Sequence, residues 1–143
     1  MSSADSAPVL AVVVNKTNPI ENLSQSQLRK ILLGEVTQFP GVDHRKVVLV
    51  HRDPESEVYR QMLLRVLRMT PAEYQRYLLA IVFRGADPIM IKTLNSDDTA
   101  AKFVFNVPNA LAVIAAAPAS AAAQMIRIVR IDGKLPGEPG YGL

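Results

Sequence analysis

One segment, residues 46–67 (KVVLVHRDPESEVYRQMLLRVL), constrains the fold of this chain more than any other stretch. Its first part, residues 47–50, is a short apolar run without helical periodicity, which is typical of a buried strand. Apolar residues then recur at spacings of three and four, as on one face of a helix: Val58, Met62, Leu63, Val66 and Leu67. The segment therefore predicts a strand, a tight turn and a helix ending at about Arg68.

The period changes at His51-Arg52-Asp53-Pro54, and the residue types there predict how the helix begins. Asp53 suits an N-cap and Pro54 suits the first helical position. The free N–H groups of the helix would then point outward beside Arg52, at the carboxyl end of the strand. Ligands bind at such corners in open α/β sheets, and a helix N-terminus favours anions.

Three more helices carry start signals, either a capping box or an acidic first turn behind a serine. They are predicted to begin at Gln25, behind the capping box Ser24–Gln27, at Pro71, behind Thr70–Glu73, and at Asp97, behind Ser96. The second of these should end at about Phe83. Its buried stripe should consist of Tyr74, Tyr77, Leu78, Ile81 and Val82.

Apolar runs at residues 10–14, 111–115 and 126–131 predict three further strands. Because short apolar runs alternate with capped amphipathic segments, we expect an α/β fold. The predicted architecture is a single lobe whose central sheet contains residues 10–14, 47–50 and 111–115, with 47–50 as the central strand, flanked by about four helices. We expect residues 1–8 to form a disordered lead-in to a domain at 9–143. The last twelve residues are predicted to lie on the surface as turns and extended chain.

Composition excludes several classes of protein. A chain of 143 residues fits one domain, and its charge of +3 comes from scattered Lys and Arg without a basic block, so no nucleic acid partner is expected. Without cysteine, the chain cannot form a disulfide, a Cys-ligated zinc site or a catalytic thiol. The apolar stretch at 110–123 is only fourteen residues long and contains Pro118, so no membrane span is predicted.

No catalytic or metal-binding motif occurs in the sequence. The histidines, His44 and His51, lack partners at metal-ligand spacing and are interpreted as surface or strand-end residues. Glu55 and Glu57 could act as an acid/base pair in a hydrolase or transferase, but acidic residues in a first helical turn are expected from the helix dipole alone. We therefore expect no enzymatic activity, no catalytic residue, no metal and no cofactor.

Four segments in order resemble the phosphate ABC-transporter substrate-binding proteins: VVVNKTNPIENLSQSQLRKILLGEVTQFPG, VVLVHRDPESEVYRQMLL, the IVFRG loop and FVFNVPNALAVIA. The resemblance covers the chain from about Val9 onward. It implies a PBP-like domain, a single lobe of the type II periplasmic-binding-protein fold. Full-length relatives clamp an anion between two lobes, of which this chain resembles one.

The resemblance also implies a set of ligand-binding residues. The family's phosphate loop has an arginine before an aspartate, then a Ser-Gly-Thr run. Arg52 and Asp53 match the first pair, and Ser56 stands in for the serine with a slip of one residue. The run reads Glu55-Ser56-Glu57, so the family's glycine and threonine are missing and two carboxylates stand beside the serine. Phosphate should consequently bind weakly or not at all.

Two functions are consistent with the sequence and the resemblance. One is a non-enzymatic, extracytoplasmic binding module for a small, phosphate-like anion. The alternative is a protein-interaction or adaptor lobe that has lost its ligand, with a transporter component, another protein or a second copy of the chain as partner. Export is suggested by the resemblance and by the small, polar residues 2–7, which suit a mature end from which a signal peptide has been removed. We therefore expect a periplasmic or otherwise extracytoplasmic location.

Overall fold

The sheet is built around a strand that is buried on both faces. The computed structural model describes residues 8–39, 46–85 and 89–143, in which six strands form one mixed sheet of order β2-β6-β1-β5-β3-β4. β1 runs antiparallel to both of its neighbours, whereas β3 runs parallel to β4 and β5. The strands are β1 (Leu10–Asn15), β2 (Asn22–Leu23), β3 (Val48–Arg52), β4 (Met90–Leu94), β5 (Ala110–Ala115) and β6 (Ile126–Ile131).

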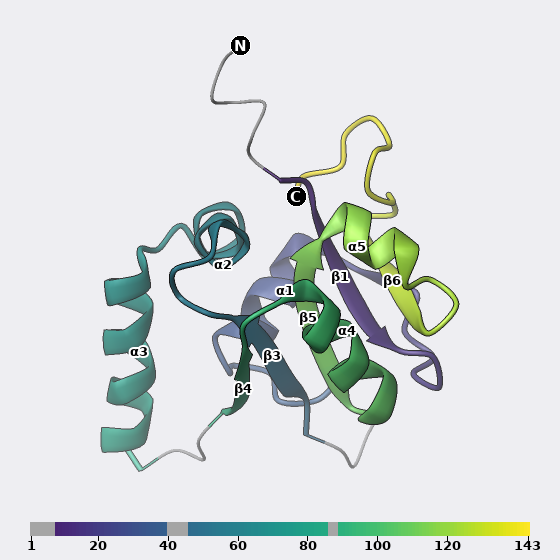
Figure 1. Ribbon diagram of the computed structural model, residues 1–143. Coiled ribbons are helices and arrows are strands. Elements are labelled where there is room, and N and C mark those ends of the chain that lie inside the picture. The colour runs from purple at the N-terminus through teal and green to yellow at the C-terminus, as the bar shows by residue number, and fades with distance from the viewer. Residues whose placement is uncertain (1–7, 40–45, 86–88) are drawn as a thin grey trace.

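Helices cover both faces of this sheet, giving three layers (Figure 1). The described helices are α1 (Gln25–Leu32), α2 (Glu57–Met62) continued by the π-helical segment η2 (Leu63–Leu67), α3 (Pro71–Phe83), α4 (Asp97–Asn106) and α5 (Ala116–Ala121). Leu10, Val12 and Val14 of β1 pack in the core under α1, α2 and η2. Ala11 and Val13 face the core under α4 and α5. No helix in the described part of the chain is both long enough and apolar enough to cross a membrane.

The predicted fold class and most predicted elements are confirmed. The fold is α/β with a mixed sheet, and all four predicted strands are present. Helices begin at Gln25, Pro71 and Asp97, and both capping boxes form as predicted. The predicted helix after β3 reaches Leu67, but its last five residues are π-helical.

Other expectations about the elements were wrong. The strand expected at residues 47–50 is not central: β3 is second from the edge, because β1 and β5 occupy the middle of the sheet. β2, β4 and α5 were not predicted, since β2 has only two residues and β4 carries the exposed residues Met90, Lys92 and Thr93. In the stripe of α3, Tyr74 and Ile81 are buried as expected, but Val82 is 57% exposed.

The C-terminal segment is integrated into the fold, which contradicts the expected surface position. Leu143 is only 4% exposed, and its carbonyl accepts a hydrogen bond from the backbone N–H of Leu10 at 3.0 Å. The hydroxyl of Tyr141 donates to the carbonyl of Leu10 at 2.6 Å. Arg65, on η2, donates to the carbonyls of Pro8 and Leu143. Figure 1 accordingly shows the C mark beside the start of β1. Residues 1–7 of the expected lead-in lie outside the described residues.

A buried hydrogen-bond chain connects α1, β3 and α3. Tyr74 is fully buried, and its hydroxyl donates to the carbonyl of Leu32 at 2.7 Å. The Nε2 atom of His51 lies 3.2 Å from the same hydroxyl. Since the hydroxyl of Tyr74 donates its proton to the carbonyl of Leu32, it can only accept a hydrogen bond from His51. The neutral imidazole is therefore assigned the tautomer with its proton on Nε2. One phenol thus satisfies two buried polar groups from different elements.

We predict that Tyr74→Phe lowers the free energy of unfolding by about 1–3 kcal/mol, because it leaves both the Leu32 carbonyl and the His51 N–H without this partner. Tyr77→Phe is the matched control: its hydroxyl also donates to a carbonyl at 2.7 Å, that of Leu33, but the bond is only part-buried. Urea denaturation of both variants should show the smaller loss for Tyr77→Phe. Equal losses would contradict the importance of burial at Tyr74.

Candidate functional site

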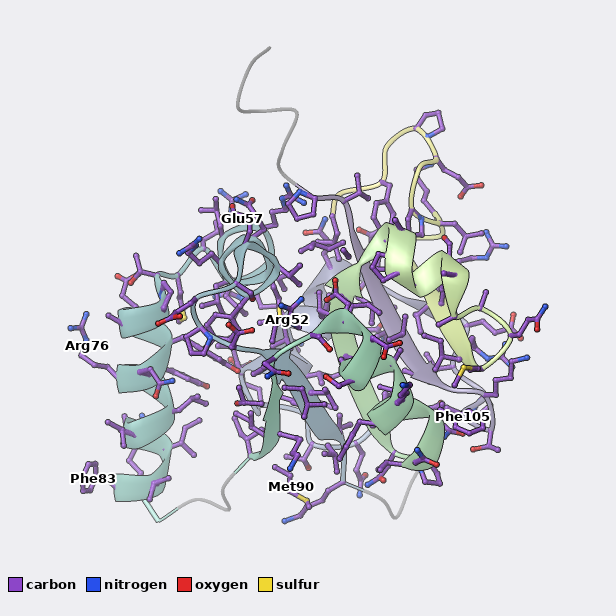
Figure 2. All side chains as sticks on the ribbon, viewed as in Figure 1. Arg52, Glu57, Arg76, Phe83, Met90 and Phe105 are labelled. Atoms are coloured by element: carbon purple, nitrogen blue, oxygen red, sulfur yellow. The ribbon has the colours of Figure 1, made fainter. Side chains whose placement is uncertain are left out.

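Three helices begin at one edge of the sheet, where the parallel strands end. α2 follows β3, α4 follows β4 and α5 follows β5, so their N-termini gather at the carboxyl ends of these strands. This is the corner at which open α/β sheets bind ligands. Arg52, the last residue of β3, lies here, and Glu57 lies on the first turn of α2 (Figure 2).

The turn after β3 differs from the predicted one. The N-cap of α2 is Ser56, not Asp53, and the first helical residue is Glu57 rather than Pro54. The Ser56 N–H donates to the carbonyl of Asp53 at 2.9 Å, which closes a turn with Pro54 at its second position, a place that proline favours. The Ser56 hydroxyl donates to the same carbonyl at 2.8 Å and accepts from the N–H of Tyr59 at 3.1 Å. Its role in the structure is capping.

Arg52 is held by groups of the protein itself. Its Nη1 atom lies 2.6 Å from Oδ1 of Asp97, the first residue of α4. The side chain of Arg52 is 15% exposed and that of Asp97 is 16% exposed. Its Nη2 atom lies 3.4 Å from a carboxylate oxygen of Asp53 and 3.4 Å from the carbonyl of Asn95. The Nε atom is buried and has no hydrogen-bond partner in the described residues. The strongest contact of the guanidinium is therefore an internal ion pair.

Carboxylates outnumber the cations at this corner. Five acidic residues occupy the turn and the two first helical turns beside Arg52: Asp53, Glu55, Glu57, Asp97 and Asp98. Two of them pair with exposed cations, Glu57 with Arg60 at 3.1 Å and Asp98 with Lys102 at 3.1 Å. A hydrogen bond from Gln61, and then one from Arg60, lower the pKa of Glu57, so this carboxylate is ionised at neutral pH. The helix dipoles of α2 and α4 thus already face acidic side chains of their own first turns.

A shallow apolar groove lies next to the acidic residues, between α4 and α5. Its volume is about 240 Å³. The lining residues are small or flexible, with two carboxylates among them: Ala101, Pro118, Ala121, Ala122, Met125, Asp97 and Asp98. The corner therefore combines negative charge with unfilled apolar surface.

The five sequence-predicted site residues run from the end of β3 to the first residue of α2, and the structure adds one residue to them, Asp97. Asp97 was predicted only as part of a helix start, yet it is the principal partner of Arg52 across 45 positions of sequence. The signal that could have found it is β4: a strand parallel to β3 and ending at Leu94 places the next helix start beside Arg52. No cluster of three or more metal-ligating side chains occurs in the described residues.

His51 stands near the end of β3, which agrees with the strand-end alternative of its interpretation, and it is buried rather than on the surface. Its ring packs edge-on against the rings of Tyr59 and Tyr74. Its Nδ1 atom has no hydrogen-bond partner in the described residues. Burial lowers the pKa of His51 from 6.5 to about 4, with a weaker opposing effect from the backbone of Val50. His44 lies outside the described residues.

The fold is similar to that of solved phosphate-transport proteins. The PstS protein of Borrelia burgdorferi matches with a TM-score of 0.72 and 20% identity over 90% of this chain and 49% of its own. An ABC-type phosphate transport receptor from Vibrio cholerae matches with a TM-score of 0.66 and 20% identity over 90% and 48%. A phosphate binding protein from Stenotrophomonas maltophilia matches with a TM-score of 0.62 and 13% identity over 90% and 40%.

These similarities confirm the PBP-like fold expected from the resemblance. The chain spans about half the length of the solved proteins that it matches. No family model and no curated protein matches the chain.

We predict that the stability of the protein depends on pH through His51. The unfolded histidine binds a proton below about pH 6.5 but the folded one only below about 4, so acid stabilises the unfolded state first. Between pH 7 and pH 4 the wild type should lose about 3 kcal/mol more than a His51→Gln variant. Urea denaturation over this pH range measures the difference, and parallel profiles for the two proteins would contradict the buried neutral imidazole.

Proposed function

We propose that this chain is a non-enzymatic, extracytoplasmic protein-interaction lobe with the fold of the phosphate-binding proteins. Its Arg52 corner would bind a cationic surface of a partner protein instead of phosphate. The fold similarity supports a binding role, since the solved proteins that it resembles are transport receptors and binding proteins. The observation that carries the proposal is the ion pair between Arg52 and Asp97 within a group of carboxylates.

This ion pair changes what the corner can attract. A phosphate dianion would gain roughly 1 kcal/mol each from Arg52 and from a helix N-terminus. At about 4 Å, a like-charge pair costs about 1 kcal/mol in a water-like dielectric and about 4 kcal/mol at an effective dielectric of 20. With Asp97, Glu55 and Glu57 close by, repulsion cancels this attraction. The same carboxylates attract lysine and arginine side chains.

The adjoining groove supplies the apolar component that a protein interface needs. Interfaces combine an apolar centre with a polar rim, and exposed apolar surface marks interaction sites. Here Ala121 and Met125 line the apolar part, and Asp97 and Asp98 contribute carboxylates. The complementary partner surface would carry an apolar side chain flanked by basic residues. The groove and the Arg52 corner share Asp97, so one partner can contact both.

A second candidate function, binding of a small anion such as phosphate, is supported by one observation. The Nε atom of Arg52 is buried without a partner in the described residues, and an anion oxygen could satisfy it. In this alternative the anion would compete with Asp97 for the guanidinium.

Calorimetry with inorganic phosphate separates the two candidates. We predict that the wild type binds phosphate with a Kd no tighter than about 1 mM, because the corner is negatively charged. Asp97→Asn should strengthen binding by releasing Arg52 from its ion pair. The double variant Glu55→Ser/Glu57→Thr should also strengthen it, by removing the two charges beside Ser56.

The control is Arg76→Gln, on the exposed surface of α3, which should leave phosphate binding unchanged. A micromolar Kd for the wild type, abolished by Arg52→Ala, would show that the lobe binds phosphate and would overturn the proposal.

A second copy of the chain is the first partner to test, and it would have to dock through a surface other than the acidic Arg52 corner. Two acidic corners repel each other, whereas α3 exposes Leu79, Val82 and Phe83, the last at 85% (Figure 2). If the lobe self-associates, we predict that it does so through α3 and that Phe83→Ser weakens the dimer. Arg76→Ser, also on α3, is the matched control. Sedimentation of the wild type as a strict monomer at millimolar concentration would contradict self-association.

A further inference from the structure

A second groove lies at the opposite end of the strands from the Arg52 corner. It is about 430 Å³ in volume and is lined by Lys16, Ala123, Ile126, Arg127, Ile128 and Leu135. Because β1 is antiparallel to β5, the carboxyl end of β1 lies at the opposite end of the sheet from the carboxyl end of β3. Lys16, directly after β1, is therefore far from Arg52, and any ligand of this groove is independent of the acidic corner.

The charge of this groove has one sign. Among the described residues that line it, the ionisable ones are Lys16 and Arg127, and both are cationic. Within residues 8–39, 46–85 and 89–143, neither side chain takes part in an ion pair, and the Nε atom of Arg127 is buried without a hydrogen-bond partner. Arg130, three residues along the same strand, pairs instead with Glu138 at 4.0 Å. The two groove cations are thus available for an external anion.

The rest of the groove is apolar. Ile126 is fully buried in the core, while Ile128 and Leu135 are half-buried and line the hollow. Ligand sites of proteins typically measure about 300–1,000 Å³ and combine apolar walls with a few polar groups that fix the orientation of the ligand. An inorganic anion would use the cations but leave the apolar surface in water. A purely apolar ligand would leave the charges of Lys16 and Arg127 without a partner.

We propose that this groove binds a small organic carboxylate with an apolar body, of the medium-chain fatty acid type. The carboxylate accepts hydrogen bonds from the guanidinium of Arg127 and is neutralised further by Lys16. The hydrocarbon chain lies on Ile128 and Leu135 and removes their exposed carbon atoms from water. Both halves of the ligand are required for binding.

The test is a titration of isotope-labelled protein with octanoate, followed by NMR, alongside acetate and octan-1-ol as probes that each lack one half of the ligand. Octanoate should saturate the site and shift the amide signals of Lys16 and of β6. Acetate and octan-1-ol should each bind at least about tenfold more weakly, since each loses either the charge-assisted hydrogen bonds or the apolar contact.

Variants on one strand make the test specific. Arg127→Gln should weaken octanoate binding by about tenfold or more, whereas Arg130→Gln should change it by less than about twofold. Lys16→Gln, in an exposed turn, should weaken it several-fold and keeps the test decisive if Arg127→Gln does not fold. The proposal is overturned if octan-1-ol binds as tightly as octanoate, if Arg130→Gln weakens binding as much as Arg127→Gln, or if octanoate does not saturate.

Discussion

The structure depends on burying β1 between two strands and two layers of helices. Residues 10–14 have no exposed surface, so their backbone polar groups must be satisfied within the protein, by β5 and β6 and, at Leu10, by Leu143 and Tyr141. The two faces of β1 carry side chains of different size: Leu10, Val12 and Val14 point to α1 and η2, whereas Ala11 and Val13 point to the α4 and α5 side. That second layer is rich in alanine, including Ala100, Ala101, Ala112 and Ala119. Small side chains allow α4 to lie close to the sheet, which brings its first residue to Arg52.

The elements that could be predicted from the sequence are those specified by short-range interactions. The capping boxes at Ser24 and Thr70 act within one helical turn, and both predicted helix starts are confirmed. β4 could not be found in this way, because it is a strand through its pairing with β3, and most of its side chains face solvent. The C-terminal segment was misjudged for a similar reason: Leu143 is buried through contacts with residues more than seventy positions away.

The candidate site shows the same division between local and long-range information. The sequence and its resemblance to a family singled out Arg52, Asp53 and Ser56 as neighbours at the end of one strand. They did not predict which group Arg52 binds. Asp53-Pro54 suits a helix start and a β-turn equally well, and only the bonds made by Ser56 decide between them. The partner of Arg52 comes from another helix. Fold similarity alone therefore does not identify a ligand.

The hydrogen bonds of Arg65 to Pro8 and Leu143 have a mechanical consequence. The two ends of the lobe lie side by side, since the backbone N–H of Leu10 donates a hydrogen bond to the carbonyl of Leu143 and Arg65 bonds to both Pro8 and Leu143. A unit with such adjacent attachment points can be spliced into a surface loop of a host protein without stretching either connection. Once spliced, it could swing as a rigid body about a single pivot, because both connections would bend at the same place. The same geometry makes the lobe a good subject for circular permutation, in which Pro8 and Leu143 are joined by a short linker.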